Sequence, residues 1–252
     1  MKANRKVPLT AYQEAIDAAI EDGVDVLNIS AGHSWPGPIN LCPYTPDAKR
    51  AVANGITVVA AAGNRKPDDD FEPVNCPAAI EDVIAVGGLV TECPADTECG
   101  VTAGIDEEDP KGPYFARKQT GVEYPEMAPD GVYCGQQGCI EGNCIIKQTE
   151  KPWQYNADPT DNKPDVLAPF HFPSTTNTDE PYLQIGTSFA APVVSGTIAW
   201  MFSELKDSGK PLPQPQTTRQ ALLQAAVSVA EGETPKLNVT RTLNVLNELA
   251  SE

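Results

Sequence analysis

The segment Gly186-Thr-Ser-Phe-Ala-Ala-Pro192 places a serine at the entrance of a long apolar run, residues 193–202. The run predicts a buried helix that begins near Ser188 and ends at about Leu205. A serine in the first helical turn is usually a cap, whose hydroxyl accepts a backbone N–H. Alternatively, the hydroxyl is a nucleophile, and the free backbone N–H of Ser188 helps to hold the oxyanion that forms when it attacks a carbonyl.

Two other segments follow predicted strands. Ser30-Ala-Gly-His33 comes after one apolar strand, and Ala62-Gly-Asn64 comes after the next. In an open parallel sheet, ligands bind beyond the carboxyl ends of the strands, so we expect both segments to lie beside Ser188. The side-chain amide of Asn64 and the backbone N–H of Ser188 would together form an oxyanion hole.

Helical and strand patterns alternate along the 252 residues. The predicted helices span 11–21, 47–54, 188–205 and 220–230, with a last one from about 240, and the predicted strands span 24–30, 56–63, 83–88 and 164–169. Thr217 to Gln220 fits a capping box that starts the fourth helix. Strands that are apolar on both faces belong in a parallel sheet covered by helices, so the expected class is α/β with an open, mostly parallel sheet.

Five blocks of the sequence resemble the subtilases, the subtilisin-like serine peptidases. They occur in the family's order, and residues 186–192 resemble the motif around the nucleophile. The blocks are 25–32, 60–64, 76–87, 163–169 and 186–192. The resemblance implies a single subtilisin-like peptidase domain over residues 1–252, with a Cys-rich insertion at about 91–162.

The resemblance also implies a role for particular residues. Ser188 becomes the nucleophile and Asn64 the side-chain donor of the oxyanion hole. Ser30, Ala31 and Gly32 would pair with a peptide or protein substrate as an added strand, and Ala62 and Gly63 would also line the substrate site. The implied activity is endopeptidase hydrolysis of peptide bonds.

The acid and the base of the family are missing from this sequence. Subtilases use Asp, His and Ser in that order, with the Asp in an Asp-Thr/Ser-Gly motif and the His in His-Gly-Thr-His, and neither motif is present. We therefore expect an N-terminally truncated domain that needs an upstream segment or a second chain to supply both groups. His33 and His171 could approach the site, but rim histidines are usually solvated or hydrogen-bonded locally.

Two alternatives follow from the missing motifs. One is a catalytically inactive pseudo-protease or peptide-binding module that keeps the fold and a peptide-binding edge. The other is a fragment that folds poorly alone, because removed strands expose sheet edges. Retention of both Ser188 and Asn64 favours the peptidase interpretation.

The composition argues against two kinds of partner, nucleic acid and a membrane. The chain carries 18 Lys and Arg against 35 Asp and Glu, a formal net charge of −17, which would repel a nucleic-acid backbone. The longest apolar run, 189–202, is too short for a membrane span. The N-terminus has positive charge but no apolar core of a signal peptide, so we expect no secretion signal in this sequence, although subtilases are often secreted. The compartment is left open.

Seven cysteines leave at least one without a partner in the chain. Five lie within 91–162, and their spacing favours disulfides over a zinc site, with reduced thiols as a further alternative. No metal ligands are assigned. Calcium could bind at the acidic runs 68–70 and 106–109, but such runs are more often solvated.

Overall fold

The computed structural model describes most of the chain outside the Cys-rich region. The described residues are 8–33, 35, 37–63, 74–89, 139–140, 143–144, 163–169, 171–174, 182–227 and 234–249. The helices are α1 (Leu9–Glu21), α2 (Thr45–Ala53), α3 (Thr187–Asp207), α4 (Pro215–Ala225) and α5 (Val239–Leu249), with a 3-10 turn η1 (Ile39–Leu41). The strands are β1 (Val26–Ile29), β2 (Thr57–Ala61), β3 (Ile84–Leu89), β4 (Cys139–Ile140), β5 (Asn143–Cys144), β6 (Val166–Pro169), β7 (His171–Ser174) and β8 (Tyr182–Ile185).

The centre of the fold is a four-stranded parallel sheet in the order β1-β2-β3-β6. All four strands coincide with predicted ones, and the expected α/β class is confirmed. Parallel strands are joined by crossovers, so α2 connects β1 to β2 and all four carboxyl ends lie at one edge of the sheet. That edge is where the sequence placed the functional residues.

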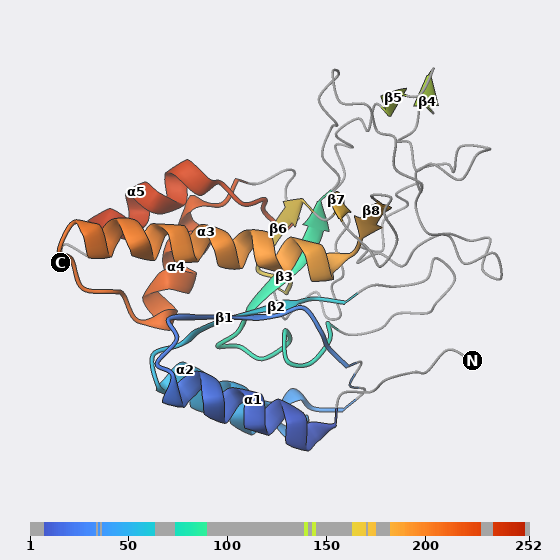
Figure 1. Ribbon diagram of the computed structural model, residues 1–252, viewed down its shortest axis with the longest axis vertical. Coiled ribbons are helices and arrows are strands. Elements are labelled where there is room, and N and C mark those ends of the chain that lie inside the picture. The colour runs from blue at the N-terminus through green and yellow to red at the C-terminus, as the bar shows by residue number, and fades with distance from the viewer. Residues whose placement is uncertain are drawn as a thin grey trace.

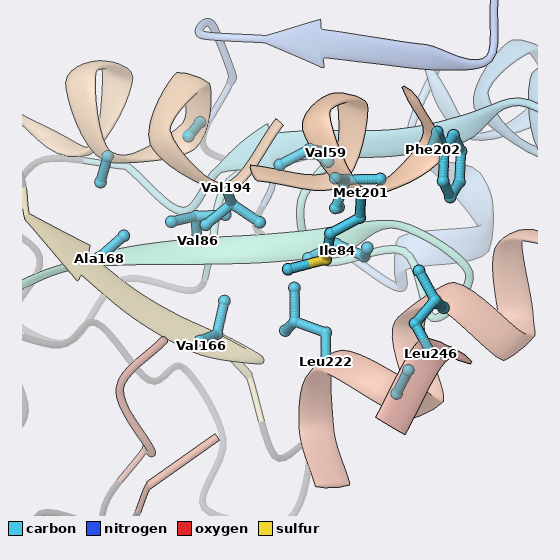
Figure 2. Packing of buried hydrophobic residues seen from close by; sticks show 14 of the residues in the cluster. Val59, Ile84, Val86, Val166, Ala168, Val194, Met201, Phe202, Leu222 and Leu246 are labelled. Atoms are coloured by element: carbon cyan, nitrogen blue, oxygen red, sulfur yellow. The ribbon is translucent and has the colours of Figure 1, made fainter. Parts of the chain in front are cut away.

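Helices cover both faces of this sheet, as Figure 1 shows, with α1 and α2 on one side and α3, α4 and α5 on the other. The pleat of β2 sends Val59 and Ala61 to the α3 face and Val58, Ala60 and Ala62 to the α1–α2 face. In Figure 2, Met201 and Phe202 of α3 pack with Leu222 of α4 and Leu246 of α5 over the strands. Apolar cores therefore pack on both faces of β2, whose five residues are all buried.

The two outer strands of the sheet differ. The outer edge of β6 is covered, because the N–H of Leu167 donates to the carbonyl of Pro235 and the N–H of Leu237 donates to the carbonyl of Leu167, both at 2.8 Å. Among the described strands, β1 pairs with β2 alone, and its residues are half-buried or exposed. Within the described part of the chain, the sheet is thus closed at β6 and open at β1.

In the C-terminal half, one predicted feature was wrong and one element was not predicted. Thr217 does not cap a helix: α4 begins at Pro215, with Gln214 as its N-cap and no capping side chain, and it ends at Ala225. Proline is favoured at the first helical position because its missing N–H is not needed there. The antiparallel hairpin of β7 and β8 was not predicted, and it leads directly into α3 through Gly186.

The predicted insertion at 91–162 lies outside the described residues except for β4 and β5. These two strands pair antiparallel, with Cys139 opposite Cys144 and Ile140 opposite Asn143. The pairing and oxidation state of the five cysteines in this region stay predictions, as does the single-domain assignment.

Candidate active site

Three chain segments meet at the carboxyl edge of the sheet: the residues after β1, the residues after β2 and the first turn of α3. The hydroxyl of Ser188 donates to the carbonyl oxygen of Ser30 at 2.9 Å, and the hydroxyl of Ser30 donates to the carbonyl oxygen of Ser188 at 2.7 Å. This reciprocal pair joins residues 158 positions apart. The prediction that Ser30 and Ser188 lie side by side is therefore confirmed by their contacts.

Ser188 is not the cap of its helix. The N-cap is Gly186, whose φ of 146° lies in the region that favours glycine, and Thr187 and Ser188 already belong to α3. The Ser188 side chain is half-buried, and its hydroxyl donates to Ser30 instead of accepting a backbone N–H. The capping interpretation of this serine is therefore wrong, and the hydroxyl is directed across to β1.

The end of β2 is fixed next to Ser188. The N–H of Gly63 donates to the hydroxyl oxygen of Thr187 at 3.1 Å, and both residues are buried. Gly63 has a φ of +116°, and an added Cβ would lie 2.6 Å from the Nδ2 atom of Asn75. Only glycine fits this position. The contact places the residue before Asn64 against the residue before Ser188.

Asn64 itself lies outside the described residues, so the position of its amide stays a prediction. The predicted convergence of Asn64 and Ser188 is supported only through their neighbours, Gly63 and Thr187. The substrate roles of the other residues also stay predictions. Ser30, Ala31 and Gly32 are exposed, whereas Ala62 and Gly63 are buried.

Both backbone groups of Ala62 are used inside the protein. Its N–H donates to the carbonyl of Val86 at 3.0 Å, and its carbonyl accepts the N–H of Asn75 at 2.9 Å. Ala62 is also fully buried, so neither its backbone groups nor its side chain is exposed to a substrate in this structure. Ser30 to Gly32 are the better-exposed candidates.

Sequence reasoning missed the support behind these segments. Cys42 and Cys76 form a disulfide, and neither belongs to the Cys-rich region. The backbone of Cys76 exchanges two hydrogen bonds of 2.9 Å with His33. Asn75 packs against Gly32, where an added Cβ would lie 2.8 Å from the Cβ of Asn75. An even cysteine count or a paired spacing could have indicated the disulfide, but this sequence has neither.

Among the residues whose side chains the structure describes, no candidate base is in hydrogen-bond contact with Ser188. His33 is exposed and held by its backbone to Cys76, and His171 sits in β7 opposite Ile185. Neither the acidic run 68–70 nor 106–109 falls within the described residues. In the part of the chain that is described, no group of three or more His, Cys, Asp or Glu could hold a metal ion. Calcium binding stays a prediction.

None of the described helices is long and apolar enough to cross a membrane. The described groups at this edge of the sheet are the Ser188 hydroxyl, the N-terminus of α3 and the end of the buried strand β2. This is the arrangement that acyl transfer by a serine requires, apart from its acid and base.

Comparison with known proteins gives the family. The sequence matches the Subtilase family over residues 1–246, and the chain therefore belongs to this family of serine peptidases. The major intracellular serine protease of Bacillus subtilis (strain 168) is 40% identical over 75 residues, which are 29% of this chain and 22% of that protein. Subtilisin of Bacillus pumilus is 32% identical over 122 residues, 45% of this chain and 43% of that protein. The chain thus spans less than half the length of these relatives.

Solved structures of similar fold extend over nearly the whole chain. The prenylagaramide maturation protease PagA aligns with a TM-score of 0.60 and 20% identity, covering 97% of this chain and 70% of that one. The PatG macrocyclase, solved in complex with peptide, aligns with a TM-score of 0.58 and 20% identity, covering 95% of this chain and 57% of that one. These similarities confirm the subtilisin-like fold.

Proposed function

We propose that this chain carries the nucleophile and the oxyanion hole of a subtilisin-like serine endopeptidase. Ser188 attacks the carbonyl carbon of a peptide bond, and the backbone N–H of Ser188 and the side-chain amide of Asn64 stabilise the resulting oxyanion. The observation that carries the proposal is the hydrogen bond from the Ser188 hydroxyl to the Ser30 carbonyl, because it holds the hydroxyl at the exposed mouth of the sheet edge. The contact between Gly63 and Thr187 supports the place of Asn64.

The proton of the Ser188 hydroxyl must pass to a base before or during attack. In the structure this proton points to a backbone carbonyl, which is too weak a base to accept it. A catalytic imidazole would compete with the Ser30 carbonyl for the same proton. We infer that His and its orienting Asp come from an upstream segment or a second chain.

The open edge of β1 supports this inference. No described strand covers it, although β1 ends at Ser30, beside the nucleophile. Unpaired N–H and C=O groups on an edge strand readily accept another strand. A segment docked there would bring its own strand end to the same side of the sheet as Ser188.

The proposed substrate is an extended peptide. Ser30, Ala31 and Gly32 are exposed after β1, and a peptide running beside them would be bound first through its backbone. An added Cβ at Gly32 would lie 2.8 Å from the Cβ of Asn75, so this position must stay glycine for the two segments to pack.

The first experiment supplies the missing groups and measures peptide hydrolysis. The chain is extended upstream by a segment with the Asp-Thr-Gly and His-Gly-Thr-His motifs, and kcat and KM are compared for Ser188→Ala and Asn64→Ala. We expect Ser188→Ala to abolish hydrolysis. We expect Asn64→Ala to lower kcat by roughly a hundred- to a thousand-fold, the loss known for the corresponding asparagine of subtilisin.

An Asn75→Ala variant is the matched control for Asn64, since its side chain lies behind Gly63 and Gly32. Its effect should be on stability and KM more than on kcat. Undiminished hydrolysis by Ser188→Ala would overturn the assignment of the nucleophile. A kcat for Asn64→Ala within about threefold of the unaltered enzyme would overturn the oxyanion role.

One observation favours a second function, that of an inactive peptide-binding module. Among the described residues, the Ser188 hydroxyl has a carbonyl and no imidazole as its acceptor. In that case the chain would bind extended peptides through Ser30 to Gly32 without cleaving them. Peptide binding that is unaffected by Ser188→Ala, with no hydrolysis by the extended chain, would decide for this alternative.

A further inference from the structure

A path of side-chain hydrogen bonds runs from the interior of α3 to the backbone of Ser188. The hydroxyl of Ser195 donates to Oδ1 of Asn28 at 3.0 Å, and Nδ2 of Asn28 donates to the hydroxyl oxygen of Ser30 at 2.8 Å. The hydroxyl of Ser30 in turn donates to the carbonyl of Ser188 at 2.7 Å. Every donor points toward Ser188, so the path has one direction.

The path begins at a buried side chain of α3 and continues through two exposed residues, Asn28 and Ser30. Ser195 is buried, with 7% of its surface exposed, and lies about two turns after Ser188 in α3. Its hydroxyl also lies 3.0 Å from the carbonyl of Ala191, so its one proton is shared between the helix and Asn28. Asn28 and Ser30 are exposed on the open-edge strand and its end.

The path connects the end of β1 to α3. The end of β1 has no second strand to hold it among the described residues, and the side chains of Asn28 and Ser30 tie it to α3 instead. We propose that Ser195 and Asn28 are positioning residues that orient Ser30 and, through it, fix the backbone of Ser188 for attack. This inference rests on the proposed function of Ser188 as the nucleophile.

Asn28 is the best position for a test, because one amide atom accepts a hydrogen bond and the other donates one. Oδ1 accepts from Ser195, and Nδ2 donates to Ser30. An Asn28→Asp change keeps the shape but replaces the donor with a carboxylate oxygen. The single proton of the Ser30 hydroxyl would then go to the carboxylate, which is the stronger acceptor, and the Ser188 carbonyl would lose its donor.

The test measures the reaction of Ser188 in the chain extended upstream by the Asp and His motifs. We compare the second-order rate of labelling by a fluorophosphonate, together with kcat and KM for a peptide. We expect Asn28→Asp to lower the labelling rate and kcat by about tenfold with little change in KM, and Ser195→Ala to lower them by about threefold. Ser195→Thr, which keeps the hydroxyl, should restore the rate.

Thr197→Ala is the matched control. Thr197 also lies in α3 and donates its hydroxyl to the carbonyl four residues earlier, Val193, at 2.8 Å, but it takes no part in the path. We expect this variant to react at the unaltered rate. An equal loss in Thr197→Ala and Ser195→Ala, or an unaltered rate in Asn28→Asp, would overturn the proposed path.

Crystal structures separate failure of the path from failure of the proposed function. If the unaltered extended chain is neither labelled nor active, the proposed function fails. The path is then tested by the crystal structure of the Asn28→Asp variant. The path predicts that Asn28→Asp turns the Ser30 hydroxyl away from the Ser188 carbonyl. A Ser30–Ser188 hydrogen bond that stays at 2.7 Å in this variant contradicts it.

Discussion

The two edges of the central sheet are built in opposite ways. At β6, residues 235–237 cover the strand with backbone hydrogen bonds, and a buried cluster of charges stands at its start. At β1, no described strand covers the edge, and the ion pair at its start, Lys206 with Asp25, is exposed. The β6 edge is covered by residues of this chain, whereas the open β1 edge ends beside Ser188, the proposed nucleophile.

The difference supports the proposal that a further segment docks at β1. An uncovered edge strand is a hazard for a protein that works alone, because it can pair with any extended chain. The open edge of β1 ends at Ser30, whose carbonyl holds the Ser188 proton. Under the proposed function, a segment that completes the sheet at β1 would also complete the catalytic site.

The largest effect should come from the charged cluster at the closed edge. Oδ2 of Asp165 accepts from Lys163 at 2.6 Å and from the N–H of Ala85 at 2.8 Å, and its other oxygen pairs with Arg219. Asp165→Ala leaves the buried Lys163 without its carboxylate, so we expect a loss of about 3–5 kcal/mol in the free energy of unfolding. Urea denaturation measures it.

The same variant should depend on pH. Burial lowers the pKa of Lys163 in the folded protein, so between that lowered pKa and the unfolded pKa of about 10.4 the folded state binds fewer protons than the unfolded state. Stability must then rise with pH from the lowered pKa up to that value. In Asp165→Ala the rise should begin at a lower pH than in the unaltered chain, because the carboxylate that favours the charged lysine is gone and the pKa of Lys163 falls further. Unfolding free energy that does not change with pH over this range would contradict the lowered pKa of Lys163.

An apolar substitution compares the two edges directly. Leu167 of β6 is fully buried, and Leu27 of β1 is only half-buried. We expect Leu167→Ala to cost about 2–5 kcal/mol of unfolding free energy and Leu27→Ala about 1 kcal/mol, because less apolar surface is lost. Extending the chain by the upstream segment should raise only the cost of Leu27→Ala. Equal costs in the unextended chain would show that β1 is already covered.

The smallest effect should come from the ion pair at the open edge. Lys206 and Asp25 lie 2.6 Å apart, with 56% and 43% of their side chains exposed. Exposed pairs contribute at most about 1 kcal/mol and are screened by salt. We expect Asp25→Ala to cost less than 1 kcal/mol in dilute buffer and almost nothing at 1 M salt. A cost that persists at 1 M salt would place this pair in a protected site.

Most of the parallel sheet was predictable because its signals are local. The apolar run 56–63 predicted β2, and Gly55, with a φ of +86°, follows Asn54, the C-cap of α2. The carboxyl-edge rule also predicted that the residues after β1 meet the start of α3. The start of α4 was missed because Pro215 opens the helix without a capping side chain, so the Thr217 pattern pointed to the wrong turn.

The details of the site could not be predicted, since they depend on contacts between distant segments. The hydrogen bonds of Ser30 with Ser188 and of Asn28 with Ser195 join positions 158 and 167 residues apart. No spacing rule relates such positions. The disulfide between Cys42 and Cys76 likewise follows from the packing of two loops.

Mass-spectrometric mapping of a fluorophosphonate adduct tests the central claim most directly. The chain is labelled alone and after addition of the segment that carries the Asp and His motifs, and the modified peptide is identified. The account predicts an adduct on Ser188 only when that segment is present. An adduct on another residue, or equal labelling of Ser188 in the chain alone, would contradict it.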